Sequence, residues 1–337
     1  MSTIGFVTCH PAKLKHYFPT ATEPNLVPVE PHFTPDDQIA VDDLRKHGFQ
    51  VEPVFWGCPV QSLERFDLII IRSPWDYMES SALRQNFLDW IDSLEQLKTP
   101  VYNPPALMKW LVDKHYLQDL HASGVNIVPT VYVERNGEID LAELIMKKGQ
   151  FILKPCISAS GVGLLHIKTE EDAKTHQKEI NEGLKSNAYM LQDFIPEITS
   201  QGEWSLIFIG GQYSHAVHKK PKRGSILIHA EQGGTLSFIS PKDEIVNFAK
   251  AAFQKVLPAF EKSVGIKFSD PDPILYLRLD IIETSSGMVL SECEGVEPEL
   301  FFRANPNAKT LFRKALESRL FPGHLAEKPL YTITKEL

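Results

Sequence analysis

Residues 276–300 read YLRLDIIETSSGMVLSECEGVEPEL, a largely apolar stretch with acidic residues in unexpected places. Two segments with strand character, 276–284 and 288–291, are joined by a Ser-Ser-Gly turn, a pattern typical of a β-hairpin. Asp280 and Glu292 lie within this hairpin, and Glu294 lies just beyond it. Because burying an unpaired carboxylate costs several kcal/mol, these acids need a compensating partner.

If the two strands pair around the turn, Asp280 and Glu292 lie close together on one face of the hairpin. Two neighbouring carboxylates repel each other unless a cation or a proton compensates them. Carboxylate oxygens combined with phosphate oxygens suit Mg²⁺. The hairpin therefore predicts a metal site, and the alternative of two unrelated surface acids is weakened by the apolar residues around them.

A second segment, FILKPCISASGVGLLHI at residues 151–167, delivers Lys154 at the end of an expected strand. A turn of small residues that includes Ser160 and Gly161 follows, and then another strand. Small residues let backbone N–H groups approach an anion, and a lysine adds a charge for phosphate. The order of residues differs from a Walker A loop. A phosphate-binding turn and a plain hairpin turn with a surface lysine both remain open.

Two further segments carry polar residues at strand ends. YMLQDFIPEI, residues 189–198, either presents main-chain groups to a planar base or is a buried strand that ends at Pro196. HAVHKKPKRG, residues 215–224, is either a solvated charged face or a strand with one cation on its inner face. Strand alternation puts Lys220 on one face and Lys219 on the other.

The first third of the chain alternates strands and helices, which predicts a doubly wound α/β unit. Expected strands cover 4–9, 49–56, 66–71 and 100–103, and expected helices cover 34–48 and 80–97. From Pro104 onward a helix through about Ser123 is expected, and the remainder is predicted to be α+β with mostly antiparallel strands.

RSPWDY, residues 72–77, follows the third expected strand, at the edge where open α/β sheets bind ligands. Arg72 could clamp a substrate carboxylate with two parallel hydrogen bonds, and Asp76 could bind an amine. The alternative is a structural turn in which Arg72 pairs with Asp76. The substrate candidates are Arg72, Ser73, Trp75, Asp76, Tyr77 and Arg303.

The composition is that of a globular protein, with 43% hydrophobic and 23% charged residues among 337. A net charge of −8 argues against a general nucleic-acid binder. The sequence shows neither a signal peptide nor an apolar run that would span a membrane. Its four cysteines lie far apart, so reduced thiols in a cytoplasmic protein are expected.

Taken in order, the polar segments resemble the ATP-grasp superfamily of carboxylate–amine ligases. The resemblance covers about residues 103–302 and begins with a helix that carries Lys114. It is closest to the glutathione-synthetase-like members. SECEGVEPELFF, residues 291–302, and RSPWDY also resemble the subgroup containing the cyclo-ligase that forms the cycloserine ring.

The resemblance implies an ATP-grasp fold with three domains and a tail, with ATP between two antiparallel sheets. The expected ranges are 1–103 for a pre-ATP-grasp α/β domain, 104–195 for the small lid domain with its lead-in helix, 196–325 for the C-terminal magnesium domain, and 326–337 for the tail. The fold class is α/β, with α+β in the central and C-terminal parts.

The resemblance also assigns residues. The ATP-binding candidates are Lys114, Lys154, Ser160, Gly161, Gln192, Asp193, Phe194, Ile195 and Glu203. The catalytic candidates near the transferred phosphate are Arg278, Lys220 and Arg223. Asp280 and Glu292 would bind one or two Mg²⁺ ions, and Glu294 stands where the family usually has asparagine.

The implied reaction activates a small-molecule carboxylate as an acyl phosphate and couples it to an amine-type nucleophile. Whether the nucleophile belongs to the same molecule, as in ring closure, is left open. A kinase or a non-catalytic ATP-binding module is the alternative. The expected partners are the carboxylate and amine substrates, with no nucleic acid and no membrane, and a homo-oligomer is compatible with the resemblance.

Overall fold

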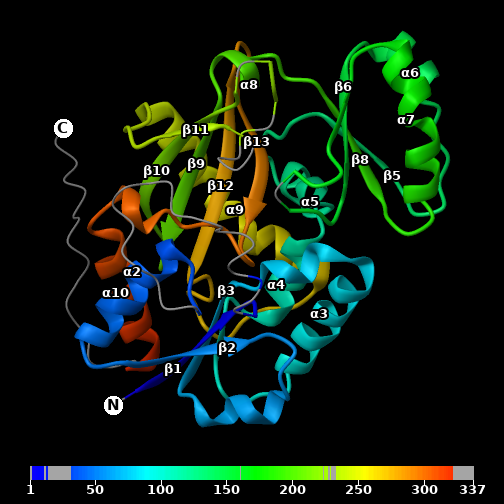
Figure 1. The fold of residues 1–337 in the computed structure, drawn as a ribbon. Coiled ribbons are helices and arrows are strands. Elements are labelled where there is room, and N and C mark those ends of the chain that lie inside the picture. The colour runs from blue at the N-terminus through cyan, green and yellow to red at the C-terminus, as the bar shows by residue number, and fades with distance from the viewer. Residues whose placement is uncertain are drawn as a thin grey trace.

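The computed structural model describes residues 2–10, 13, 32–159, 161–222, 224–226, 228 and 233–321. Its strands form three sheets that follow one another along the chain, each covered by helices (Figure 1). The predicted mixed α/β fold is confirmed. No helix in the described part of the chain has both the length and the apolar character needed to span a membrane.

The first sheet is parallel, with the strand order β2-β1-β3-β4. Its strands are β1 (Thr3–Thr8), β2 (Gln50–Phe55), β3 (Leu68–Ser73) and β4 (Val101–Tyr102). Helix α2 (Pro35–Lys46) packs with Ile4 and Phe6 on one face, while α3 (Ser81–Leu94) packs with Val7 and Ile71 on the other. Helices on both faces confirm the predicted doubly wound unit.

The second sheet is antiparallel, with the order β5-β8-β6-β7. Its strands are β5 (Thr130–Val133), β6 (Phe151–Pro155), β7 (Leu165–Ile167) and β8 (Tyr189–Asp193). Helices α6 (Leu141–Lys148) and α7 (Glu170–Gly183) pack on one face of this sheet, at the right edge of Figure 1.

The helix expected from Pro104 to about Ser123 is instead two helices, α4 (Pro105–Val112) and α5 (Tyr116–Ala122). The chain leaves helical geometry at Asp113, whose φ and ψ are −98° and 114°. Here the Lys114 N–H donates to the carbonyl of Cys156 at 3.0 Å, a bond to a residue after β6 that replaces an intrahelical one. The single-helix prediction was wrong because this long-range bond interrupts the helix.

The third sheet is also antiparallel, with the order β11-β10-β9-β12-β13. Its strands are β9 (Glu203–Ile209), β10 (Gln212–Lys220), β11 (Thr235–Ser237), β12 (Tyr276–Thr284) and β13 (Gly287–Glu294). The hairpin expected from residue 276 onward is therefore confirmed. Short helical segments lie at Val60–Arg65, Trp75–Glu79, Glu197–Ser200 (α8) and Phe302–Ala304.

The two faces of the third sheet have different neighbours. Helix α9 (Asp243–Val264) packs against alternate side chains such as Phe208, Leu279 and Ile281. On the opposite face, α10 (Ala308–Leu320) lies beside α2 and covers only the end near Tyr276. The remaining part of that face is turned toward the second sheet.

Asn103, a fully buried residue just after β4, joins the first sheet to the base of the β12–β13 hairpin. Its Oδ1 accepts a hydrogen bond from the Leu275 N–H at 2.8 Å, and its Nδ2 donates to the carbonyls of Tyr276 at 2.8 Å and Gly295 at 2.6 Å. Gly295 leaves no space for a side chain, since a Cβ there would lie 2.5 Å from Leu111 Cδ1. One amide group therefore holds both ends of the hairpin.

We expect Asn103→Ala to lower the free energy of unfolding by about 2–4 kcal/mol, because it leaves buried main-chain groups without partners. Chemical denaturation followed by circular dichroism measures this change. Asn126→Ala is the matched control, since its exposed Nδ2 makes one bond of 2.8 Å to the Met288 carbonyl. Equal losses for the two variants would refute the special role of Asn103.

His215 on β10 gives a pH-dependent contribution to stability. Its Nε2 donates to the carbonyls of Leu300 at 3.0 Å and Phe301 at 3.1 Å, and burial lowers its pKa from 6.5 to about 4. Between these values the unfolded chain binds a proton that the folded chain does not. Stability is therefore lost as the pH falls through this window.

For this reason the unfolding free energy of the wild type should fall between pH 7 and pH 5 by about 2 kcal/mol more than that of His215→Gln. Denaturant titrations of both proteins at the two pH values test this. Parallel pH dependence in the two proteins would mean that His215 does not titrate as inferred.

Candidate active site

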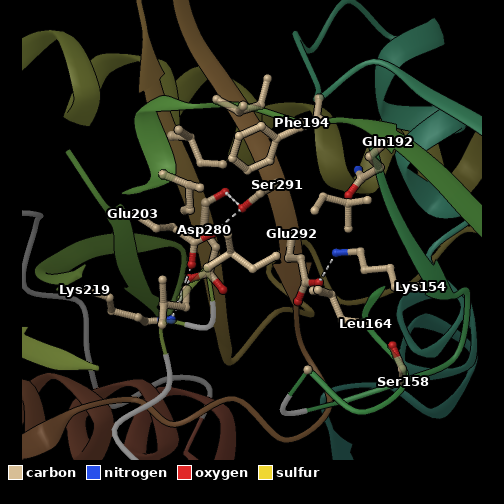
Figure 2. A pocket seen from close by; sticks show the side chains of 18 of the residues that line it. Lys154, Ser158, Leu164, Gln192, Phe194, Glu203, Lys219, Asp280, Ser291 and Glu292 are labelled. Carbon is tan, nitrogen blue, oxygen red and sulfur yellow. Dashed lines mark hydrogen bonds and ion pairs between the residues drawn. The ribbon is translucent and has the colours of Figure 1, made fainter. Parts of the chain in front are cut away.

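A cleft lies between the second and third sheets and encloses about 970 Å³, open solvent at its mouth included. Figure 2 shows Lys154 and Gln192 on one side and Glu203, Lys219 and Asp280 on the other. The lining residues used below are Val128, Ile152, Lys154, Ser158, Gly161, Leu164, Gln192, Asp193, Phe194, Ile195, Ile198, Glu203, Lys219, Arg278, Asp280, Ile282, Ser291, Glu292 and Glu294.

Strand register explains why polar residues from four strands share one face of the third sheet. Lys219 lies opposite Glu203, Ser205 opposite Asp280, and Asp280 opposite Glu292. Directly opposed residues of antiparallel strands point to the same side. The third sheet therefore presents one row of ionisable groups to the cleft.

A β-bulge modifies this row on β13. Asp280 pairs with Glu292 while Ile281 pairs with Leu290, so Ser291 is an extra residue in its strand. Both Ser291 and Glu292 line the cleft. The Ser291 hydroxyl donates to Glu203 Oε2 at 2.7 Å. The bulge thus adds a hydroxyl beside the acids, a use of bulges that is frequent near functional sites.

Arg278 joins two of the hairpin acids from the same face. Its Nε and Nη2 donate to Asp280, with Nη2 at 2.9 Å from Oδ2, and Nη2 also contacts Glu294. Asp280 additionally accepts from the Ser205 hydroxyl. Burial alone would raise the pKa of Asp280, but Arg278 and Lys219 outweigh burial and lower it.

Glu292 is bound from the opposite side of the cleft. Lys154 Nζ lies 2.6 Å from Glu292 Oε1, and Lys114 Nζ lies 4.0 Å from the same atom. Burial would raise the pKa of Glu292, but the two lysines hold it well below its usual range. Two lysines therefore approach Glu292 of the third sheet: Lys154 from the second sheet, and Lys114 from the segment that precedes that sheet in the chain.

Lys219 is the buried cation of β10, with its Nζ 3.6 Å from both Glu203 Oε1 and Asp280 Oδ1. Lys220, the residue chosen from the sequence, is exposed and does not line the cleft. The prediction that Lys220 faces the site is therefore wrong, because the register with β9 turns Lys219 inward. Arg223 and Ser160, two other candidates, lie outside the described residues.

Two carboxyls of the cleft have raised pKa values. Burial, followed by the charge of Asp280, raises the pKa of Glu203 to about 7. Burial raises the pKa of Glu294 to about 8, with Asp280 and Glu292 adding to the effect against Arg278. In the absence of a further cation, the cleft therefore favours protonation of some of its acids near neutral pH.

Asp280, Glu292 and Glu294, called the carboxylate cluster below, can each offer an oxygen within 4.8 Å of the others. Hard oxygen ligands in this arrangement fit Mg²⁺, which typically takes a few carboxylates and completes its shell with phosphate and water. The lysines on the opposite side fit phosphate groups. The residues present thus suit a magnesium–nucleotide complex.

The other end of the cleft is apolar and suits a planar base. It is formed by Val128, Ile152, Leu164, Phe194, Ile195, Ile198 and Ile282. Phe194 stacks on His166 with ring centroids 4.2 Å apart. Gln192 donates to Thr130 Oγ1 at 3.0 Å, and Asp193 pairs with Lys148 at 2.7 Å. Gln192 is thus held by a neighbouring strand, and Asp193 by the end of α6.

The substrate candidates do not line this cleft. Arg72 is 2% exposed, donates to Asp37 Oδ1 at 3.1 Å and to the Pro298 carbonyl at 2.8 Å. Asp76 instead accepts from Trp56. The Arg72–Asp76 pairing is therefore wrong. Arg72 Nη1 is buried without a hydrogen-bond partner among the described residues, so its contact with a substrate carboxylate stays a prediction.

The other substrate candidates also make protein contacts. Tyr77 donates to Glu297 Oε1 at 2.6 Å, and Trp75 donates to the Glu297 carbonyl at 3.0 Å. Ser73 donates to Thr8, and Arg303 pairs with Asp36 and Glu299. Sequence reasoning missed Lys219, Ser205 and Ser291. Alternation along β10 was the signal for Lys219, whereas no local pattern reveals the bulge at Ser291.

Two family models match the chain. Residues 4–103 match the N-terminal domain of the D-cycloserine synthetase DcsG, and residues 118–259 match the ATP-grasp domain of prokaryotic glutathione synthetase. The cycloserine biosynthesis protein DcsG of Streptomyces lavendulae is 28% identical over an alignment of 298 residues that covers 84% of this chain and 93% of that protein.

A glutathione synthetase of Parasynechococcus marenigrum (strain WH8102) is 26% identical over 206 residues, 60% of this chain and 64% of that protein. Among solved structures, D-cycloserine synthetase DcsG has a TM-score of 0.73 at 22% identity and covers 95% of this chain and 100% of its own. D-alanine–D-alanine ligase from Bacillus anthracis has a TM-score of 0.61 at 11% identity, covering 94% and 95%. These structural likenesses concern the fold.

Proposed function

We propose that this chain, which belongs to the ATP-grasp superfamily of carboxylate–amine ligases, activates a small-molecule carboxylate as an acyl phosphate. An amine-type nucleophile then displaces phosphate and forms a C–N bond. One observation carries the proposal: the carboxylate cluster faces Lys154 and Lys114 across a cleft with an apolar end. This arrangement suits a nucleotide whose phosphates lie between cations and a metal.

In this proposal Asp280, Glu292 and Glu294 hold Mg²⁺, which when bound neutralises charge on the phosphate oxygens. Lys154 would exchange its bond to Glu292 for phosphate oxygens, and Lys114 would exchange its bond of 2.5 Å to the Ser158 carbonyl. Lys219 and Arg278 lie next to Asp280, where they stabilise the negative charge of the phosphoryl group in transit. The chain thus contributes mainly positioning and charge compensation, as phosphoryl transfer requires.

The residues Val128, Phe194 and Ile195 support the adenine end of this proposal because they provide flat apolar surface. Glu203 lies at the β9 start of the same cleft, although its contacts with Lys219 and Ser291 tie it to the ionic row. We therefore assign Glu203 to that row and keep the ribose contact predicted from the sequence as a hypothesis.

The similarity to a cycloserine biosynthesis protein supports a substrate that carries carboxylate and nucleophile in one molecule. The test measures phosphate release from ATP with Mg²⁺ over amino acids, dipeptides and ureido or hydroxamate-type acids, with mass spectrometry of each product. A product lighter than its single substrate by one water supports ring closure. Two substrates joined with loss of water support intermolecular ligation, and a product heavier by one phosphoryl group would overturn the ligase proposal.

We expect Lys219→Met to lower kcat on the order of 100-fold, because it removes a buried cation beside the transferred phosphate. Lys220→Met, the neighbouring exposed lysine, should change kcat little. Steady-state kinetics with the substrate found above, on proteins with matched unfolding curves, checks this difference. Similar losses in both variants would exclude the assignment of Lys219.

We also expect Glu292→Gln to raise the Mg²⁺ concentration for half-maximal activity about tenfold or more, since a charged metal ligand is lost. Glu283→Gln is the control on the same hairpin, because Glu283 pairs with Lys242 at 2.7 Å and does not line the cleft. A Mg²⁺ titration at fixed ATP gives both values. An unchanged requirement in Glu292→Gln would place the metal elsewhere.

A further inference from the structure

A second group of ionisable side chains lies at the break between α4 and α5, beside the lysines of the cleft. His115 Nδ1 is 2.5 Å from Asp113 Oδ1, and His115 Nε2 is 3.2 Å from Glu134 Oε1. Cys156 Sγ lies 4.0 Å from the same Nε2. Asp113, His115 and Cys156 can each offer one ligand atom within 4.8 Å of the others. Together with Glu134, these three residues form what we call the thiol–imidazole cluster.

We propose that the thiol–imidazole cluster binds one Zn²⁺ ion through Cys156 Sγ, His115 Nε2 and the Glu134 carboxylate, with water as the fourth ligand. A thiolate, an imidazole and a carboxylate together form a donor set that zinc accepts readily and that Mg²⁺ does not prefer. The proposed site is therefore chemically distinct from the carboxylate cluster.

The geometry of His115 supports this assignment. Metal-bound histidines usually give their second ring N–H to a carboxylate, which fixes the ring. Asp113 lies at Nδ1 in that position, and the Tyr132 ring stacks on the imidazole with centroids 4.5 Å apart. Nε2 is thereby turned toward Cys156 and Glu134.

Two of the three ligand separations are close to those of a zinc site, and the exposed Glu134 side chain has to rotate to bring a carboxylate oxygen toward the Cys156 sulfur. Zinc bonds of about 2.0–2.3 Å in a tetrahedron separate neighbouring ligand atoms by roughly 3.2–3.8 Å. The present separations are 4.0 Å from sulfur to Nε2 and 3.2 Å from Nε2 to Oε1. When the zinc–sulfur and zinc–nitrogen bonds form, the Cys156 thiol and protonated Nε2 each release one proton to solvent.

The difference in burial between Cys156 and Glu134 indicates from which side a zinc ion would enter the site. The Cys156 residue is 1% exposed, while the Glu134 side chain is 73% exposed. An ion therefore meets Glu134 and His115 at the surface and the thiol at the bottom of the site. The solvent side leaves room for the water ligand.

The consequence for the cleft rests on the proposed function. Lys114 lies between Asp113 and His115, and its N–H donates to the carbonyl of Cys156 at 3.0 Å. Cys156 follows Lys154 by two residues. A zinc ion would thus connect the two backbone segments that carry the lysines facing Glu292, and would fix their separation.

The test measures Zn²⁺ binding to the full-length protein by competition with a chromophoric chelator, in excess Mg²⁺ to occupy the carboxylate cluster. We expect one tightly bound ion. Cys156→Ser and His115→Gln should each weaken its binding about 100-fold or more, and Glu134→Gln about tenfold. Glu134 is exposed, so this third variant keeps the test valid if a buried substitution prevents folding.

Co²⁺ replacement gives a readout specific to sulfur, because a cobalt–thiolate bond has its own charge-transfer absorption in the near ultraviolet. This absorption should disappear in Cys156→Ser and persist in Cys58→Ser, the half-buried cysteine used as control. Absence of tight Zn²⁺ binding by the wild type, or unchanged binding in Cys156→Ser, would overturn the proposal. Ligase activity without zinc binding would refute this site alone, and zinc binding without ligase activity would refute only the proposed function.

Discussion

Charge compensation across the cleft is the constraint on which the site depends. Four acids, Glu203, Asp280, Glu292 and Glu294, pair with four cations. Lys114 and Lys154 reach Glu292 from the opposite side, whereas Lys219 and Arg278 belong to the same sheet as the acids. Breaking a buried pair by removing one partner is strongly destabilising, so neither half of this set is stable alone. The cations come from four separate parts of the chain, and the fold must bring them together to compensate the acids once these are buried.

Much of this arrangement can be predicted from the sequence because it follows local rules. The Ser-Ser-Gly turn and the two apolar strands predict the hairpin that carries Asp280 and Glu292, but the register of the turn alone would set Asp280 opposite Ser291. The bulge at Ser291 brings Glu292 to that position. Alternating apolar strands and capped helices likewise predict the first sheet. In both cases the local pattern predicts the element, and in the first sheet it also decides which side chains share a face.

The remaining features depend on contacts between distant segments. Alternation separates Lys219 from Lys220, but only the pairing of Lys219 with Glu203 decides which one faces the acids. The helix break at Asp113 depends on a bond to the Cys156 carbonyl, and the burial of Arg72 depends on Asp37 and Pro298. Helix and strand propensities and hydrophobic periodicity do not take such distant partners into account. At these positions tertiary contacts therefore decide the structure instead of the local sequence pattern.

The Asn103 amide makes the two walls of the cleft mechanically unequal. It fixes both ends of the β12–β13 hairpin to the strand end of the first sheet, so the wall that carries Asp280 moves with that sheet as one body. The opposite wall is joined to this body by the chain around residues 113–130 and 193–203 and, across the cleft, by the ion pair of Lys154 with Glu292. Arg84 of α3 adds hydrogen bonds to the Ile157 carbonyl at 3.2 Å and to Asn187 Oδ1 at 2.6 Å. A rotation that widens the cleft is therefore a motion of the second sheet, and it has to break the Lys154–Glu292 ion pair.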